Sequence, residues 1–345
     1  LSSALQFRPN DKVDVGLNWV YSSFDATTDS YNSFAEFRRS GVWGYPHITV
    51  ESITLDPGGD YVVAGNFSDV GLRTESRQNA DETDFNQITA DLNWAISDSL
   101  ELRGMIGRAK SEFFDDYFRV NIETPEPGAV FSYDFTGDAN VAAITYDLDV
   151  TDPDNFFIMT NERIEQNLVN RTNDTFRLDL NWAMSDEQYF DFGVIFNTRE
   201  VDSQIYRCPS CEDQTDINGL SQVYNYSDLG GYGSGTQLDF LVLNFDRAKA
   251  AYGPYNWELY AGPGRATWVV EEETSGAFVD YNLDTSVADR PLRLNLGIRY
   301  ADTKTTATGY ISSTDTNVET NSYDNWLPSL NVAFDATDEL VLRAG

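Results

Sequence analysis

The chain has 345 residues, of which 56 are Asp or Glu and 23 are Lys or Arg, so its formal net charge is −33. This acidic balance argues against a nucleic-acid partner, because phosphate recognition needs a basic surface. The single His leaves no multi-His metal site, and we expect no enzyme, no catalytic residue and no metal ligand set. No apolar run approaches the roughly 18 residues that a transmembrane helix requires.

Alternating apolar and polar residues predict β-strands along the whole chain. In the clearest segments every second residue is apolar, and from 292 to 300 every residue between is polar or small. These apolar residues are, in chain order, Val13, Val15, Leu17, Trp19 and Tyr21; Ile88, Ala90, Leu92, Trp94 and Ile96; Phe176, Leu178, Leu180, Trp182 and Met184; Phe190, Phe192, Val194 and Phe196; Ala277, Val279, Tyr281 and Leu283; and Leu292, Leu294, Leu296, Ile298 and Tyr300. The best helix candidate is a short segment at 245–252, inside a loop.

Short and long connections alternate between these strands. Turn-forming residues at 8–11, 97–99, 185–187, 287–290 and 335–338 predict five tight turns and about ten antiparallel strands. Long polar segments occupy roughly 25–69, 115–160, 204–263 and 312–322. This asymmetry predicts an all-β fold, an antiparallel transmembrane β-barrel with short periplasmic turns and long extracellular loops, whose apolar residues face lipid. A soluble β protein stays as the alternative.

The last third of the chain resembles strands of TonB-dependent outer-membrane receptors. The residues that carry the likeness are Thr267 to Tyr281, Arg290 to Tyr300, Thr303 to Tyr310, Tyr323 to Asn331 and Asp338 to Arg343. The opening segment from Leu5 to Val15 resembles an earlier hairpin of the same barrel. The likeness covers most of the strands and little of the loops, and the order of the segments resembles the long-loop subgroup linked to carbohydrate and siderophore uptake.

The resemblance implies a barrel of about 22 strands that encloses an N-terminal plug domain. It implies import of a scarce nutrient across the cell outer membrane of a Gram-negative bacterium, driven by a TonB complex that acts on the plug. We expect residues 1–345 to be part of a single barrel domain, with the plug and the first and last strands outside this chain. Pro328 falls inside a predicted strand, a position that proline normally avoids unless the strand is at an edge.

Cys208 and Cys211 form the most compact motif, Cys-Pro-Ser-Cys, within a long loop. A structural zinc site would lack two ligands. We therefore expect a loop disulfide formed in an oxidising compartment, with two free thiols as the alternative.

Aromatic residues are frequent in the predicted loops, and aromatic rings stack on sugars and contact siderophores. The candidate ligand-binding residues are Trp43, Tyr45, Tyr224, Tyr226 and Trp257. The alternative is that such residues pin the loops to one another. Acidic clusters at 115–116, 152–154 and 271–273 offer oxygen ligands for Ca²⁺, but their spacing matches no EF-hand loop, so solvated charge is the preferred interpretation. We expect no other cofactor.

The sequence leaves three functions open. The leading one is an active importer that binds an oligosaccharide or a ferric siderophore in its outer loops and whose barrel contacts outer-membrane lipid. The second is a passive porin with a similar wall. The third is a secreted soluble β-rich binding protein. The acidic loops weakly disfavour a strongly anionic substrate.

Overall fold

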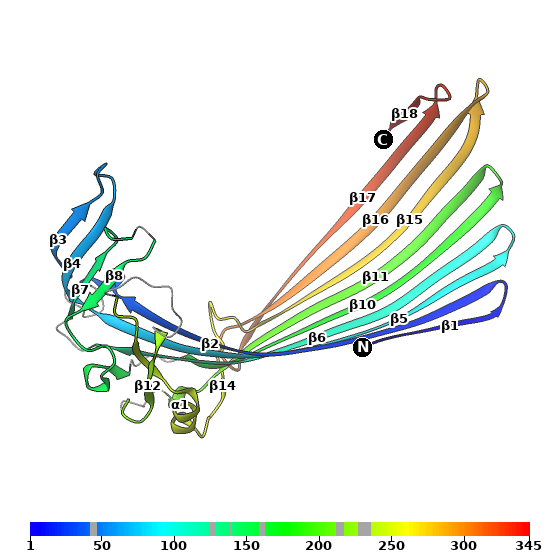
Figure 1. Ribbon diagram of the computed structural model, residues 1–345. Helices are drawn as coiled ribbons and strands as arrows, with labels where there is room; N and C mark the ends of the chain where they lie inside the picture. The colour runs from blue at the N-terminus through cyan, green and yellow to red at the C-terminus, as the bar shows by residue number, and fades with distance from the viewer. Residues whose placement is uncertain (42–46, 125–127, 139, 159–162, 212–216, 227–235) are drawn as a thin grey trace.

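The computed structural model of the protein describes residues 1–41, 47–124, 128–138, 140–158, 163–211, 217–226 and 236–345. One antiparallel sheet, the main sheet, dominates it, and its long strands follow one another in chain order (Figure 1). These strands are β1 (Ser2–Asn10), β2 (Val13–Ala35), β5 (Leu72–Ser97), β6 (Leu100–Glu123), β10 (Arg163–Ser185), β11 (Gln188–Arg207), β15 (Trp268–Val287), β16 (Arg290–Tyr310), β17 (Thr316–Asp335) and β18 (Val341–Ala344). Two short strands, β9 (Phe157–Ile158) and β14 (Glu258–Leu259), pair with β6 and β11.

The order of the strands confirms the all-β class and the predicted succession of antiparallel strands joined by tight turns. The β15–β16 hairpin closes through Ala288 and Asp289, both with positive φ, which is the backbone that two-residue hairpin turns of type I′ require. Pro328 lies inside β17 opposite Ile298, and β18 pairs with β17 only from Val332 onward. Pro328 therefore lies within a strand, as the sequence predicted.

The predicted bounds of the long loops were wrong, because several strands are longer than the alternation indicated. β2 continues to Ala35 and β6 ends at Glu123, so these two strands occupy parts of the ranges 25–69 and 115–160. Apolar alternation fades along these extensions, where charged residues stand on both faces. The backbone ladder nevertheless continues without a break in register.

One face of the main sheet carries a band of exposed apolar side chains, which we call the belt face. Ile106, Leu296 and Trp326 are 61%, 53% and 64% exposed on this face, and register places Ala90 and Phe176 on either side of Ile106. The accessible surface of the chain is 20508 Å², against roughly 14,000 Å² for a soluble monomer of its mass. The apolar side chains are therefore not buried between two stacked sheets, as they would be in a soluble sandwich.

The opposite face of the main sheet, the polar face, carries amides, carboxylates and arginines. In β16 the residues between the belt leucines are Arg293, Asn295, Gly297 and Arg299. Gly297 has close neighbours: an added Cβ would meet the Asp280 carboxylate at 1.8 Å. In a closed transmembrane barrel the polar face would line the bore and the belt face would meet lipid.

Smaller elements gather at the end of the long strands away from the short turns (Figure 1). They are the sheet β3 (Thr49–Leu55), β4 (Val62–Val70), β7 (Ala129–Asp134) and β8 (Ala143–Tyr146), the hairpin β12 (Ser221–Tyr224) and β13 (Phe240–Leu243), the helix α1 (Phe245–Tyr252) and the 3-10 turns η1 (Phe37–Arg39), η2 (Pro153–Asn155) and η3 (Pro209–Cys211). α1 confirms the predicted helix. Asn244 caps its N-terminus, because the Asn244 side chain accepts the N–H of Arg247 at 3.1 Å.

These outer elements share a hydrophobic cluster with the main sheet, here the outer cluster, built around Phe118, Ile122, Leu241, Leu243 and Phe245. Phe118 is edge-on to both Phe245 and Tyr252 of α1. Hydrogen bonds to the backbone of β13 add to this contact. Ser76 Oγ accepts the N–H of Leu243 at 2.9 Å, and the Thr74 hydroxyl donates to the Leu241 carbonyl at 2.8 Å. Thr74 and Ser76 share the belt face with Ile88, so the outer cluster covers an extension of that face.

Candidate functional site

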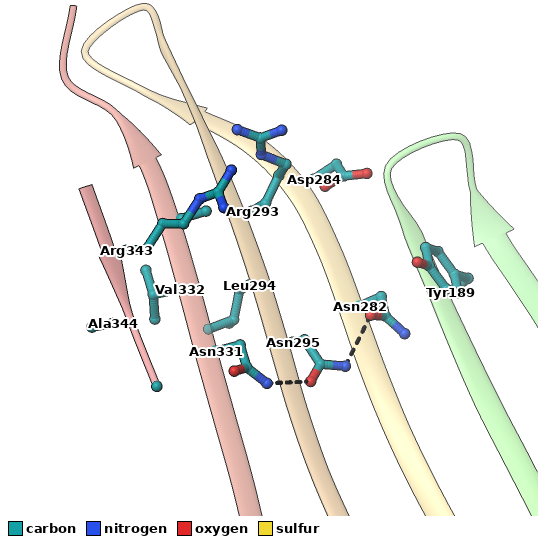
Figure 2. Close-up of a pocket in the computed structure, with 12 residues that line it drawn as sticks. Tyr189, Asn282, Asp284, Arg293, Leu294, Asn295, Asn331, Val332, Arg343 and Ala344 are labelled. Atoms are coloured by element: carbon teal, nitrogen blue, oxygen red, sulfur yellow. Dashed lines mark hydrogen bonds between the residues drawn. The ribbon is translucent and has the colours of Figure 1, made fainter. Parts of the chain in front are cut away.

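A groove opens on the polar face near the short turns, between β11 and β18. Its volume is about 590 Å³, and Tyr189, Asp284, Arg293 and Arg343 contribute polar atoms to its lining. Figure 2 shows Asn282, Asn295 and Asn331 side by side on three neighbouring strands at its floor.

A ladder of amide hydrogen bonds crosses this floor, and we call it the amide ladder. Asn331 donates to Asn295 at 3.0 Å, and Asn295 donates to Asn282 at 3.0 Å. Asn282 then donates to one oxygen of Asp191 at 3.1 Å, while Asn181 donates to the other at 2.7 Å. Five strands of the wall, β10, β11, β15, β16 and β17, are thus joined by side chains as well as by backbone. The ladder presents a hydrophilic inner wall.

Charged residues concentrate at the opposite end of the polar face, toward the outer elements. Glu36 pairs with Arg73 at 2.9 Å. Glu165 is 4% exposed and accepts a hydrogen bond from Arg207, whose guanidinium also stacks on the Tyr260 ring at 3.7 Å. Such buried pairs hold the ends of neighbouring strands together, and removing one partner would leave an uncompensated charge.

Asp115 lies on the same face of β6 and is 6% exposed. Burial raises the pKa of its carboxyl, while hydrogen bonds from the Asn167 and Asn79 amides act in the opposite direction. Asn167 donates at 3.0 Å and Asn79 at 3.3 Å. Asp115 is therefore a buried polar group of the outer wall that two amides hold in place.

The structure places three of the aromatic candidates among the outer elements. The Tyr224 ring lies 4.8 Å from that of Tyr31, and Tyr226 lies 6.0 Å from Tyr224. Trp257 stacks on Tyr255 at 5.4 Å, and all three candidates pack against the outer cluster. A role of these residues in ligand binding stays a prediction. Trp43 and Tyr45 lie outside the described residues.

Cys208 and Cys211 are joined by a disulfide in the structure, with a Cα–Cα distance of 5.4 Å. Both residues are buried in the outer cluster, at 4% and 1% exposure. Formation of this bond in the mature protein stays a prediction. Across the residues that the structure describes, no group of three or more His, Cys, Asp and Glu side chains is arranged to hold a metal ion.

Within the same described part of the chain, no helix is long and apolar enough to cross a membrane.

A sequence model of the family described as TonB dependent receptor-like, beta-barrel matches residues 112–345. The match spans more than half of the chain and most strands of the main sheet. This chain belongs to the TonB-dependent receptor β-barrel family. The expectation drawn from the strand resemblance is thereby confirmed, and the long-loop subgroup stays a prediction.

Two solved structures from Acinetobacter baumannii are similar to the chain. The siderophore receptor PiuA shares 10% identity with a TM-score of 0.31, over 98% of this chain and 47% of the receptor. The ferric preacinetobactin receptor BauA shares 11% identity with a TM-score of 0.38, over 99% of this chain and 43% of the receptor. The chain therefore spans less than half the length of either receptor. A comparison with curated proteins found no match.

Proposed function

We propose that the protein containing this chain is a TonB-dependent importer of the outer membrane, which takes up a scarce nutrient through a plugged barrel. The observation that carries the proposal is the division of the main sheet into a belt face and a polar face in a chain of this family. Exposed Ile106, Leu296 and Trp326 suit contact with lipid, and the amide ladder suits a water-facing bore.

Family membership also supports the proposed partners. A TonB complex would supply the energy through a plug domain, because the outer membrane itself carries no ion gradient or nucleotide to drive uphill transport. Lipid of the outer membrane would contact the belt face. The outer elements, which lie at the end opposite the short turns, would face the medium and meet the nutrient first (Figure 1).

The nutrient is an oligosaccharide or a ferric siderophore on this proposal. Aromatic rings and amides of the outer elements suit both classes. The experiment is growth of a deletion strain on single carbon sources and, separately, under iron limitation, with complementation by the full-length gene. A growth defect in one condition that also appears on TonB depletion supports import of that class. Normal growth of the deletion strain in all conditions would contradict the proposal.

Liposome swelling separates the importer from a passive porin. The full-length protein should give little flux of small sugars, because a plug would fill the bore. Fast swelling by the intact protein would instead favour a porin.

A further inference from the structure

Three arginines stand in one row across the polar face of the main sheet, at its outer end. Register pairs Arg77 of β5 with Arg119 of β6, and Arg119 in turn with Arg163 of β10. All three share the face opposite to Ile88, Ile106 and Phe176, since no register shift separates the two ends of these strands.

Such a row costs stability, because like charges directly opposite each other on neighbouring strands repel. Nearby carboxylates neutralise the positive charge of the row only in part. Glu75 approaches Arg119 only to 3.9 Å, beyond hydrogen-bond distance. Glu165 lies 3.5 Å from Arg163 but is shared with Arg207. In the part of the chain that the structure describes, Arg77 has no ion pair and no side-chain hydrogen bond.

The guanidinium groups of the row also keep unused donors. The Nε of Arg119 is buried and has no hydrogen-bond partner among the described residues. The Arg119 side chain is nevertheless 24% exposed and that of Arg163 is 46% exposed, so an approaching molecule can reach them. The outer cluster covers the other face of the same strands and leaves the row on the side of the bore.

We propose that Arg77, Arg119 and Arg163 bind an oxyanion, a ligand that presents carboxylate or phosphate oxygens to the bore. Each guanidinium is planar and can give two parallel hydrogen bonds to such a group. The inference rests on the proposed function and names the ligand's chemistry: the nutrient carries an anionic group that meets the row on entry. The net charge of −33 repels anions at long range, and a local row of arginines supplies the attraction that the rest of the surface lacks.

Calorimetric titration of the purified full-length protein in detergent at low ionic strength tests the site. Citrate is the carboxylate probe and pyrophosphate the phosphate probe. The wild-type protein should bind at least one of them, more weakly as salt rises. R119Q should weaken binding about tenfold, as expected for loss of one charge-assisted contact. R108Q is the matched control, because Arg108 is on the belt face and its side chain is 63% exposed; it should bind like the wild type.

A stability measurement separates a binding site from a structural ion network. R77Q removes a repelling charge, so its urea midpoint should equal or exceed that of the wild type. Absence of binding of both probes, equal loss in R108Q and R119Q, or a clear fall in the midpoint of R77Q would each overturn the proposal. TonB-dependent growth without binding of either probe would exclude the arginine site and leave the proposed function intact. Probe binding together with TonB-independent growth would support the site and exclude the proposed function.

Discussion

Ile106 and Phe118 lie on the same face of β6, yet their side chains are 61% and 1% exposed. The difference comes from what lies against them. Ile106 belongs to the belt, where the described residues leave the sheet uncovered, and Phe118 lies under α1 in the outer cluster. Between them Arg108 faces Asp174 at 3.6 Å, and Lys110 faces Glu112 at 2.8 Å. One continuous face is therefore apolar and open, then charged, then apolar and covered.

The outer cluster should depend on Phe118. Phe118→Ala removes a buried ring and should cost the cluster about 3–5 kcal/mol, because the rings of Phe245 and Tyr252 lose their common neighbour. Limited proteolysis should then cleave the segment 244–267 faster, while the main sheet stays resistant. Phe157→Ala is the control, because Phe157 is 42% exposed in the same region. Equal protease resistance of the wild type and the Phe118 variant would contradict the assignment.

The amide ladder should stabilise the wall. Asn295→Leu removes a donor to Asn282 and an acceptor for Asn331, which should lower the free energy of unfolding by about 1–3 kcal/mol. The measurement is urea unfolding of the full-length protein in detergent, followed by Trp fluorescence. Asn325→Leu, on the same face of the neighbouring strand and exposed, is the matched control and should change little. The same loss in both variants would mean that leucine itself, rather than the ladder, destabilises the wall.

The Cys208–Cys211 bond should affect one loop and leave the barrel intact. The intact mass of the protein after alkylation without reductant should show no added alkyl group, and after reduction it should show two. Cys208→Ser should raise hydrogen exchange in η3 and around Tyr252, because Cys211 and Tyr252 belong to the same buried cluster. Two alkylated thiols in unreduced protein would exclude the bond.

The β3–β4 hairpin should loosen in acid. The Asp56 carboxylate accepts the N–H groups of Gly58, Asp60 and Tyr61, at 3.1, 2.8 and 2.8 Å. These hydrogen bonds hold the pKa of Asp56 below its usual value, and the one from Tyr61 has the largest effect. Because the folded pKa is lowered, the stabilisation is complete above the ordinary pKa of Asp and is lost as pH falls through the folded pKa.

Hydrogen exchange of these three amides, corrected for the intrinsic rate, should therefore increase at low pH. Asp56→Asn keeps one acceptor oxygen and cannot titrate in this range, so its corrected exchange should not depend on pH. A similar pH dependence in the wild type and in this variant would assign the effect to another group.

Sequence alone predicts the main sheet because apolar residues alternate strictly with polar or small residues in its clearest strands. From Leu292 to Tyr300 each belt residue is apolar and each intervening residue is polar or small, so strand, face and turn follow directly. The Phe245–Tyr252 helix was also predicted, as the best helix candidate within a loop. The ends of the strands were not predicted. Toward the outer elements, Phe118 and Thr74 contact segments that are more than one hundred residues away in the chain.

The amide ladder and the arginine row could not be predicted, because both depend on register between strands. Asn282, Asn295 and Asn331 are ordinary polar-face residues in their own strands, and only pairing brings them into one line. Arg77, Arg119 and Arg163 are likewise far apart in sequence. Loop aromatics such as Tyr224 were visible in the sequence, but their packing against Tyr31 was not.

If the belt face meets lipid and the polar face meets water, spin labels at two neighbouring positions on opposite faces should report different surroundings. Leu296 is on the belt face, and Ser329 is on the polar face of the next strand, opposite Gly297. Each is replaced by a single labelled cysteine in the full-length protein in lipid bilayers, with Cys208 and Cys211 changed to serine. The label at 296 should collide mainly with dissolved oxygen, and the label at 329 mainly with a water-soluble nickel chelate. A label at 296 that is shielded from both reagents, or that meets the nickel chelate as often as the label at 329, would exclude contact of the belt face with lipid.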